Sequence, residues 1–318
     1  MPSLHHLPAP AKINLFLHIT GRRPDGYHLL QSVFMLIDWQ DTLHIDTRAD
    51  GHIRRHDLNV ALPADDLCLK AARLLQAESG TTLGCDIRIE KNVPWGAGLG
   101  GGSSDAATVL LALNQLWGLH WPRSRLLALA VRLGADVPFF VRGHNAWVEG
   151  IGEQITPLAL PDEVLQTPLM LLKPAIAVPT AAIFGSDALK RDTKPAIVSD
   201  FLAAPKRFGQ NDLQDAAVAY QASSDSGNDI GLALEVMQNH FGNSRMTGSG
   251  STVFSWVSPE QISHLTPIQP SDLGLNDALW IGRVCRGLPQ HPLLKMLVQI
   301  ADCCHRKRDA NEQQTCKA

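Results

Sequence analysis

The most constraining feature of the sequence is a glycine-rich segment that follows a predicted strand and opens a predicted helix. Residues 85–90 alternate like a strand, and residues 105–117 have the apolar spacing of a helix that Gly118 ends. Glycines let several backbone N–H groups converge, and the positive end of a helix attracts anions, so phosphate binding is predicted. The predicted phosphate-binding segment, called the glycine loop below, comprises Pro94, Trp95, Gly96, Ala97, Gly98, Leu99, Gly100, Gly101, Gly102, Ser103 and Ser104.

Three alternatives to this interpretation can be compared with the sequence. Residues 96–101 match G-x-G-x-x-G, but a dinucleotide-binding fold needs an acidic residue about 20 positions later, and none lies between Asp105 and Asp136. A Walker loop needs a Gly-Lys step, and the chain contains no Gly-Lys pair. A flexible surface loop seldom opens a well-formed helix with paired serines. A different type of phosphate loop is therefore indicated.

Two features at the end of the glycine loop leave roles open. Ser103 and Ser104 could cap the helix, contact a phosphate oxygen or hold a magnesium ion. Asp105 suits the positive end of the helix dipole but would repel a phosphate placed against it. We therefore expect the side chain of Asp105 to point aside or toward a metal ion.

A strand is predicted at residues 12–19, with one apolar face that is buried. The other face carries a set that is unusual for a water-facing surface: Lys12, Asn14, Phe16 and His18. Alone, Lys12 would be an ordinary solvated lysine. Residues 21–26 have the composition of a turn, which places Tyr27 and His28 near the end of the first strand if the chain forms a hairpin.

The same periodicities predict the other main elements. Strands are expected at 33–37 and 42–45, and helices at 67–76, 125–133 and 213–222. Residues 135–138 are short and bounded by proline, so a loop carrying Asp136 is predicted there. Taken alone, an aspartate in such a loop is more often a turn or capping residue.

Prolines at positions 157, 161, 168 and 174 place a domain boundary near residue 160. The predicted domains are therefore 1–160 and 161–297, followed by a polar tail, 298–318, which we expect to be poorly ordered. The second domain contains another glycine segment, residues 245–251, which leads into an apolar run.

Composition excludes several classes of protein. The 318 residues include 28 basic and 31 acidic side chains, which do not supply the broad cationic surface that nucleic acid requires. Six scattered cysteines without C-x-x-C spacing argue against a disulfide framework or a zinc ribbon. The chain shows neither an export signal nor about 20 consecutive apolar residues. We expect a soluble, cytoplasmic monomer or homodimer without nucleic-acid or membrane partners.

Three segments together resemble the GHMP family of small-molecule kinases: Pro-Ala-Lys-Ile-Asn-Leu at 10–15, the glycine loop, and Thr-Gly-Ser-Gly-Ser at 247–251. The likeness extends over residues 8–297, although Trp95 stands where a smaller residue is expected. The resemblance implies a two-domain α+β protein. Its first domain would be ribosomal S5 domain 2-like, its second ferredoxin-like, and its active site would lie in the cleft between them.

Within the family, residues 11–17, 23–28, 133–138 and 140–143 are most similar to kinases of the non-mevalonate isoprenoid pathway. This resemblance implies that ATP, with Mg²⁺, phosphorylates the 2-hydroxyl of a cytidine diphosphate derivative of methylerythritol. It implies that Asp136 accepts the hydroxyl proton and that Lys12 stabilises Asp136 and the transferring phosphoryl group. The implied substrate-binding residues are Asn14, Tyr27, His28, Thr180 and Phe184.

Two rival functions follow from the same motifs. One is another GHMP activity, such as a mevalonate or homoserine kinase, against which residues 23–28 and 140–143 argue. The other is a nucleotide-binding module without catalysis, against which the presence of Lys12, Asp136 and Ser104 argues.

Overall fold

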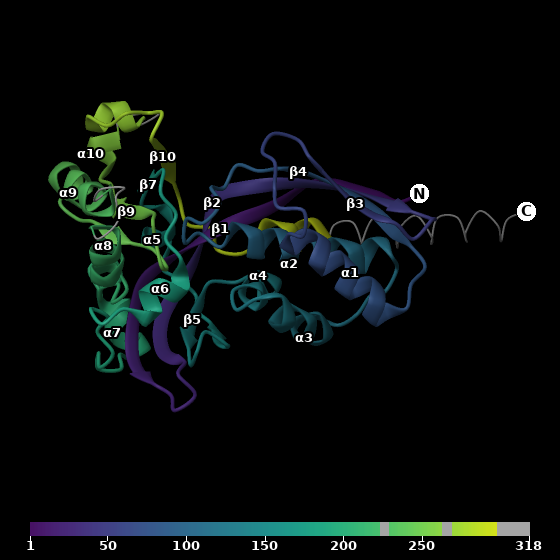
Figure 1. The fold of residues 1–318 in the computed structure, drawn as a ribbon, viewed down its shortest axis with the longest axis horizontal. Helices are drawn as coiled ribbons and strands as arrows, with labels where there is room; N and C mark the ends of the chain where they lie inside the picture. Colours follow the sequence, from purple (N-terminus) through teal and green to yellow (C-terminus); the bar gives the residue numbers. More distant parts are fainter. Residues whose placement is uncertain (223–228, 263–268, 298–318) are drawn as a thin grey trace, which may run out of the picture.

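The computed structural model of the protein describes residues 1–222, 229–262 and 269–297. Within these ranges the chain forms two sheets with helices packed beside them (Figure 1). The first sheet consists of β1 (Ser3–Arg22), β2 (His28–Arg48), β3 (Ile53–Asp57), β4 (Gly84–Glu90), β5 (Ala146–Glu149) and β6 (Gln154–Pro157). The second consists of β7 (Leu169–Pro174), β8 (Arg245–Met246), β9 (Val253–Trp256) and β10 (Trp280–Cys285).

The helices divide between the two sheets. Beside the first sheet lie α1 (Leu67–Ser79), α2 (Gly101–Leu116), α3 (Arg123–Leu133) and α4 (Val137–Arg142) (Figure 1). The later part of the chain forms α5 (Asp162–Gln166), α6 (Thr180–Gly185), α7 (Val198–Ala203), α8 (Gln214–Ala222), α9 (Asp229–Phe241), α10 (Pro259–Ile262) and a 3-10 helix (Pro270–Leu273). In the described ranges, none of the helices has the length and apolar character needed to cross a membrane.

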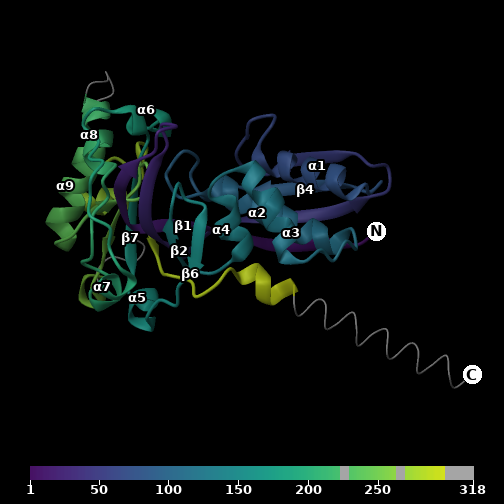
Figure 2. The ribbon, with the colours of Figure 1, turned by 90° about the horizontal axis from the view of Figure 1, so that it is seen from below.

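β1 and β2 form one long antiparallel hairpin whose turn lies at the predicted position (Figure 2). The prediction of two separate strands at 33–37 and 42–45 was wrong, because residues 38–41 continue β2. Polar groups interrupt the apolar alternation there, but they find partners within the fold. The N–H of Asp38 donates to the carbonyl of Arg286 (3.0 Å), and the side chain of Asp41 is fully buried.

The prediction that only one face of β1 is buried was also wrong. Lys12 and Asn14 on the polar face are 3% and 1% exposed, and Phe16 is fully buried. The glycine loop covers this face at Lys12, whose N–H donates to the carbonyl of Leu99 (2.9 Å). The unusual composition of the face is thus explained by burial against another part of the chain.

Two predicted boundaries differ from the structure. α2 begins at Gly101, before the predicted start at residue 105, since a pattern of apolar residues does not detect a glycine-rich first turn. The residue before this helix is Gly100, so neither following serine caps it. Residues 135–138 are not entirely a loop. α4 begins within them, with Pro138 in its first turn, where the fixed backbone angle of proline is compatible with a helix.

The helices predicted at 67–76, 125–133 and 213–222 and the strand at 85–90 are confirmed. The second sheet has the order β10-β7-β9-β8 with antiparallel pairing, and its elements follow as strand, helices, two strands, helix, strand. This is the ferredoxin-like arrangement. The two-domain α+β class is confirmed, whereas the boundary at residue 160 stays a prediction. The tail 298–318 lies outside the described residues.

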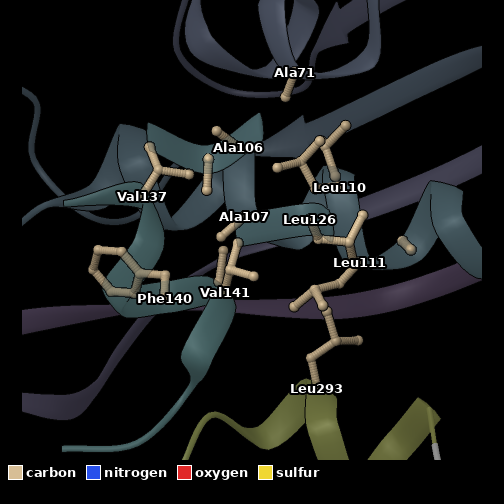
Figure 3. Close-up of a cluster of buried hydrophobic side chains, with 14 of the residues drawn as sticks. Ala71, Ala106, Ala107, Leu110, Leu111, Leu126, Val137, Phe140, Val141 and Leu293 are labelled. Carbon is tan, nitrogen blue, oxygen red and sulfur yellow. The ribbon is translucent and has the colours of Figure 1, made fainter. Parts of the chain in front are cut away.

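The core of the first domain forms where α2 packs against α3 and α4 (Figure 3). Its fully buried members include Ala107 and Leu110 of α2 and Phe140 and Val141 of α4. Leu293, from near the end of the described chain, also belongs to this core. α4 therefore rests on residues that are far apart in the sequence.

The chain returns from the second domain to the first after β10 (Figure 2). The N–H of Leu288 donates to the carbonyl of Leu36 (2.8 Å), and the N–H of His291 donates to that of Gly143 (2.8 Å), which ends α4. Residues 287–297, called the return segment below, therefore hold the end of α4 in place.

Beneath the glycine loop, one buried lysine lies between two buried aspartates. Nζ of Lys91 donates to Oδ2 of Asp105 (2.6 Å) and to Oδ2 of Asp41. The other oxygen of Asp41 accepts the N–H groups of Asn92 (2.6 Å) and Val93 (2.7 Å), which lead into the loop. Asp105 thus points aside, toward a lysine, which was one of its two expected orientations.

Burial determines the charge of this triad of Asp41, Lys91 and Asp105. Burial, together with the charge of Asp41, raises the pKa of Asp105 well above its ordinary value, although Lys91 opposes the shift. Burial alone would lower the pKa of Lys91, but the two carboxylates raise it overall. A protonated Asp105 leaves one cation beside one anion, which avoids a net buried charge.

At neutral pH we expect Asp105→Asn to be at least as stable to urea as the wild type, because the amide replaces an already neutral carboxyl group. An unfolded aspartate loses its proton near pH 4, whereas the folded one keeps it, so wild-type stability falls as the pH rises above about 4. The advantage of the variant should therefore shrink toward that pH. Urea unfolding at both pH values measures this difference.

The matched control is Asp41→Asn, which weakens the ion pair with Lys91 and disturbs the carboxylate that accepts two backbone N–H groups. We expect it to lose roughly 3 kcal/mol of unfolding free energy. Equal destabilisation by the two substitutions would mean that Asp105 is ionised in the folded protein.

Candidate active site

A cleft of about 410 Å³ lies between the two domains. Its wall is formed by β1, the glycine loop, the start of α4, the start of α6 and the second glycine segment. Of the predicted site residues, it brings together Lys12, Asn14, Gly96, Gly98, Gly100, Ser103, Asp136, Thr180 and Phe184. Residues from both domains therefore meet in one cavity.

Lys12 is held at the centre of the cleft by hydrogen bonds that leave its ammonium group directed. Its Nζ donates to Oδ1 of Asn14 (2.7 Å) and lies 4.5 Å from the centre of the Phe34 ring. Asn14 is fixed in turn, since its Nδ2 donates to the hydroxyl of Ser32 (2.8 Å). A buried ammonium group with fixed partners provides a preorganised positive charge.

Asp136 immediately precedes α4 and makes no side-chain capping hydrogen bond to that helix. Its Oδ2 lies 3.5 Å from Nζ of Lys12, and its side chain is 30% exposed, whereas that of Lys12 is 4% exposed. The carboxylate is thus paired with a buried cation and still open to a ligand in the cleft.

The glycine loop presents glycines to the cleft and other side chains to the interior. Ala97 and Leu99 are buried in the core between the domains, and the glycines between them have positive φ angles. A Cβ on Gly98 would lie 2.4 Å from the carbonyl oxygen of Thr247, and one on Gly100 would lie 3.0 Å from the ring of Phe140. These two positions thus require glycine for close packing as well as for backbone conformation.

The other residues of the predicted loop lie differently. Gly101 and Gly102 belong to the first turn of α2. Pro94 is half-buried, and the ring of Trp95 is 71% exposed. Ser103 lines the cleft, whereas Ser104 is fully buried and its hydroxyl has no hydrogen-bond partner among the described residues.

The second glycine segment packs directly against the glycine loop. The hydroxyl of Thr247 accepts the N–H of Asn14 (2.8 Å), and the hydroxyls of Ser249 and Thr180 lie 2.8 Å apart. A Cβ on Gly248 would lie 2.9 Å from the carbonyl oxygen of Gly98. The segment therefore links both domains at the cleft.

Sequence reasoning missed Asn211, which supports this segment from beneath. Its Nδ2 donates to the carbonyls of Met246 (2.7 Å) and Gly248 (2.8 Å), and its Oδ1 accepts the N–H of Leu213. The available signal was an Asn-Asp pair just before a predicted helix, which is typical of a helix start.

A second cavity, of about 430 Å³, adjoins the cleft and shares Leu30, Ile151 and Phe184 with it. It is lined by Tyr27, which is exposed, and by His28, which is buried. The predicted substrate residues thus divide into two groups. Asn14 and Thr180 line the cleft, Tyr27 and His28 line the second cavity, and Phe184 lines both.

The described residues contain no group of three or more His, Cys, Asp and Glu side chains that could hold a metal ion. The unpartnered hydroxyl of Ser104 is the polar atom of the glycine loop that remains available to a ligand. Any metal at this site would therefore depend on oxygen atoms of a bound ligand.

Comparison with known proteins agrees with this geometry. The profile described as GHMP kinases N terminal domain matches residues 66–144. A 4-diphosphocytidyl-2-C-methyl-D-erythritol kinase of Methylibium petroleiphilum is 58% identical over 293 residues, which cover 92% of this chain and 98% of that protein.

Solved structures show the same relationship. A crystal structure of 4-(cytidine 5'-diphospho)-2C-methyl-D-erythritol kinase matches with a TM-score of 0.71 and 32% identity, covering 90% of this chain and 100% of that one. The mevalonate kinase of Methanococcus jannaschii has a TM-score of 0.62 at 14% identity, over 90% of this chain and 98% of that chain, and so shares the fold alone. The chain belongs to the 4-diphosphocytidyl-2-C-methyl-D-erythritol kinase family of the GHMP kinases.

Proposed function

We propose that the protein transfers the γ-phosphate of ATP to the 2-hydroxyl of 4-diphosphocytidyl-2-C-methyl-D-erythritol in the non-mevalonate isoprenoid pathway. The observation that carries this proposal is the pair of Lys12 and Asp136, whose Nζ and Oδ2 atoms lie 3.5 Å apart in the cleft lined by the glycine loop. The names of the relatives support the choice of substrate.

Asp136 is proposed to accept the proton of the attacking hydroxyl group. Its side chain is partly exposed in the cleft and makes no capping bond to α4, so a carboxylate oxygen is free to approach a substrate hydroxyl. Phosphoryl transfer demands little covalent chemistry from the protein beyond orienting the nucleophile and removing its proton.

Lys12 is proposed to stabilise both the carboxylate and the transferring phosphoryl group. An ammonium group has three donors. One is used by Asn14 and one faces Asp136, which leaves a donor for a phosphoryl oxygen in the cleft. Because Lys12 is almost entirely buried, its charge acts with little screening by water.

The glycine loop and the start of α2 are proposed to hold the phosphates of ATP through backbone N–H groups and the helix dipole. Ser103 lines the cleft there, and the buried hydroxyl of Ser104 would contact a phosphate oxygen or Mg²⁺. Magnesium would neutralise charge on the phosphates, which would also supply most of its ligands.

The second cavity is proposed to hold the cytidine part of the substrate. Tyr27 and Phe184 provide aromatic faces, and stacking on a base contributes about 1 to 3 kcal/mol. Asn14 and Thr180 would then lie beside the erythritol part, near the reacting hydroxyl. A cytoplasmic location, a monomeric or homodimeric state and the absence of nucleic-acid or membrane partners stay predictions.

Radiolabelled ATP, offered with the cytidyl substrate, with mevalonate and with homoserine in parallel, tests the function directly. We expect phosphorylation of the cytidyl substrate alone, because the second cavity is separate from the phosphate site and can accept a nucleoside. Preferential labelling of mevalonate or homoserine would overturn the proposed substrate, and ATP binding without any transfer would overturn the assignment of catalysis.

Asp136→Ala should lower kcat by at least about 100-fold, because it removes the proposed general base. Binding of ATP, measured by calorimetry, should be largely retained. The control is Asp162→Ala, which changes an exposed aspartate at the start of α5. Near-normal turnover by the Asp136 variant would show that another group accepts the proton.

Lys12→Met should lower kcat by roughly 100-fold to 1000-fold, because a chain of similar length replaces a preorganised charge. Lys70→Met, which changes an exposed lysine of α1, should leave turnover unchanged. Urea unfolding of both variants separates a catalytic loss from a folding defect. A loss of only about twofold in the Lys12 variant would rule out its proposed role.

A further inference from the structure

The guanidinium group of Arg191 connects the two domains beside the second cavity. Its Nε donates to Nε2 of His28, at 3.1 Å, in the first residue of β2. Its terminal nitrogens donate to the carbonyls of Leu189 (3.1 Å) and Ser186 (2.7 Å) and lie 3.5 Å from that of Phe184. One side chain thus ties the end of the β1–β2 hairpin to the end of α6 and the turn that follows it.

The bond to Nε2 fixes the protonation state of the imidazole. Arginine has only hydrogen-bond donors and stays charged, so Nε2 of His28 must contribute a lone pair. An imidazolium ion, or a neutral ring with its proton on Nε2, would place two donors against each other. Only the neutral ring with its proton on Nδ1 fits this contact.

The electrostatic environment of His28 agrees with a neutral ring. Burial lowers the pKa of His28, and the positive charges of Arg191 and Arg22 lower it further. The ring is 9% exposed, and its remaining polar atom is Nδ1. Any ligand group that hydrogen-bonds to this imidazole must therefore be an acceptor.

Arg191 also positions the aromatic wall of the cavity. The ring of Phe184 packs on that of His28 with centroids 5.3 Å apart and planes inclined by 35°. Arg191 holds His28 through a ring nitrogen and approaches the backbone of Phe184 through its carbonyl. Both rings line the second cavity, so a change at Arg191 reaches two of its walls.

We propose that Arg191 is a positioning residue for the cytidyl substrate, which holds the His28 imidazole in the neutral, Nδ1-protonated form and orders it against Phe184. This inference rests on the proposed function and deepens it. Nδ1–H becomes a fixed donor at the cavity, and cytosine offers acceptors at its carbonyl oxygen and at N3. Arg191 contacts His28 and backbone carbonyls, so it acts through them.

Steady-state kinetics of Arg191→Met provide the first test. We expect the KM for the cytidyl substrate to rise roughly 10-fold to 100-fold, as for the loss of one charge-assisted hydrogen bond, with the KM for ATP unchanged. Arg191→Lys should not restore the wild-type value, because an ammonium group cannot reproduce the planar fork. Arg132→Met, which removes an exposed arginine of α3, is the control.

Nitrogen-15 NMR of labelled histidines tests the tautomer without any use of activity. The His28 signal, assigned by its loss in His28→Asn, should report a protonated Nδ1 in the wild type and in Arg132→Met. In Arg191→Met we expect a proton on Nε2 or a mixture of both forms. A wild-type proton on Nε2, or an unchanged tautomer in Arg191→Met, would overturn the proposal.

A double substitution tests whether Arg191 acts through His28. Adding Arg191→Met to His28→Asn should raise the KM for the cytidyl substrate little further, because the partner of the arginine is already gone. Additive effects, or an equal rise in the KM for ATP, would show a general structural role instead. If the wild type does not phosphorylate the cytidyl substrate, the proposed function fails, and the NMR result still decides the tautomer.

Discussion

The buried ammonium group of Lys12 is the constraint on which the cleft depends. A charge taken out of water must be paired and hydrogen-bonded, and here Asn14 and Asp136 provide the partners. Asn14 is held by Ser32 on the neighbouring strand and donates its backbone N–H to Thr247 of the second domain. The requirement to satisfy one cation thus brings together β1, β2, the start of α4 and the second glycine segment.

The strand that carries this lysine belongs to every hydrophobic core of the protein. Leu7 lies in the core with α2, Ile13 in the core between the domains, and Ile19 in the core of the second domain. Because all three cores fix the same strand, the polar residues between them have little freedom. The cleft is therefore positioned by apolar packing on both sides, and its polar groups need to adjust only locally.

Much of this arrangement could be predicted from the sequence, and the failures have physical causes. The glycine loop, the hairpin turn and the helices at 67–76 and 125–133 follow from local patterns that the structure preserves. The continuity of β2 across residues 38–41 could not be predicted, because Asp41 is satisfied by residues about 50 positions away. The roles of Asn211 and Arg191 also depend on distant carbonyl groups and rings, which no local pattern reveals.

The return segment has a consequence for how the chain reaches its folded state. During synthesis the N-terminal part of a protein usually folds first, as soon as its own core can form. Here Leu293 completes the core around α4, and His291 holds the residue that ends that helix. The first domain thus stays without part of its interior until nearly the whole described chain has left the ribosome, so the catalytic aspartate takes its final position late in synthesis.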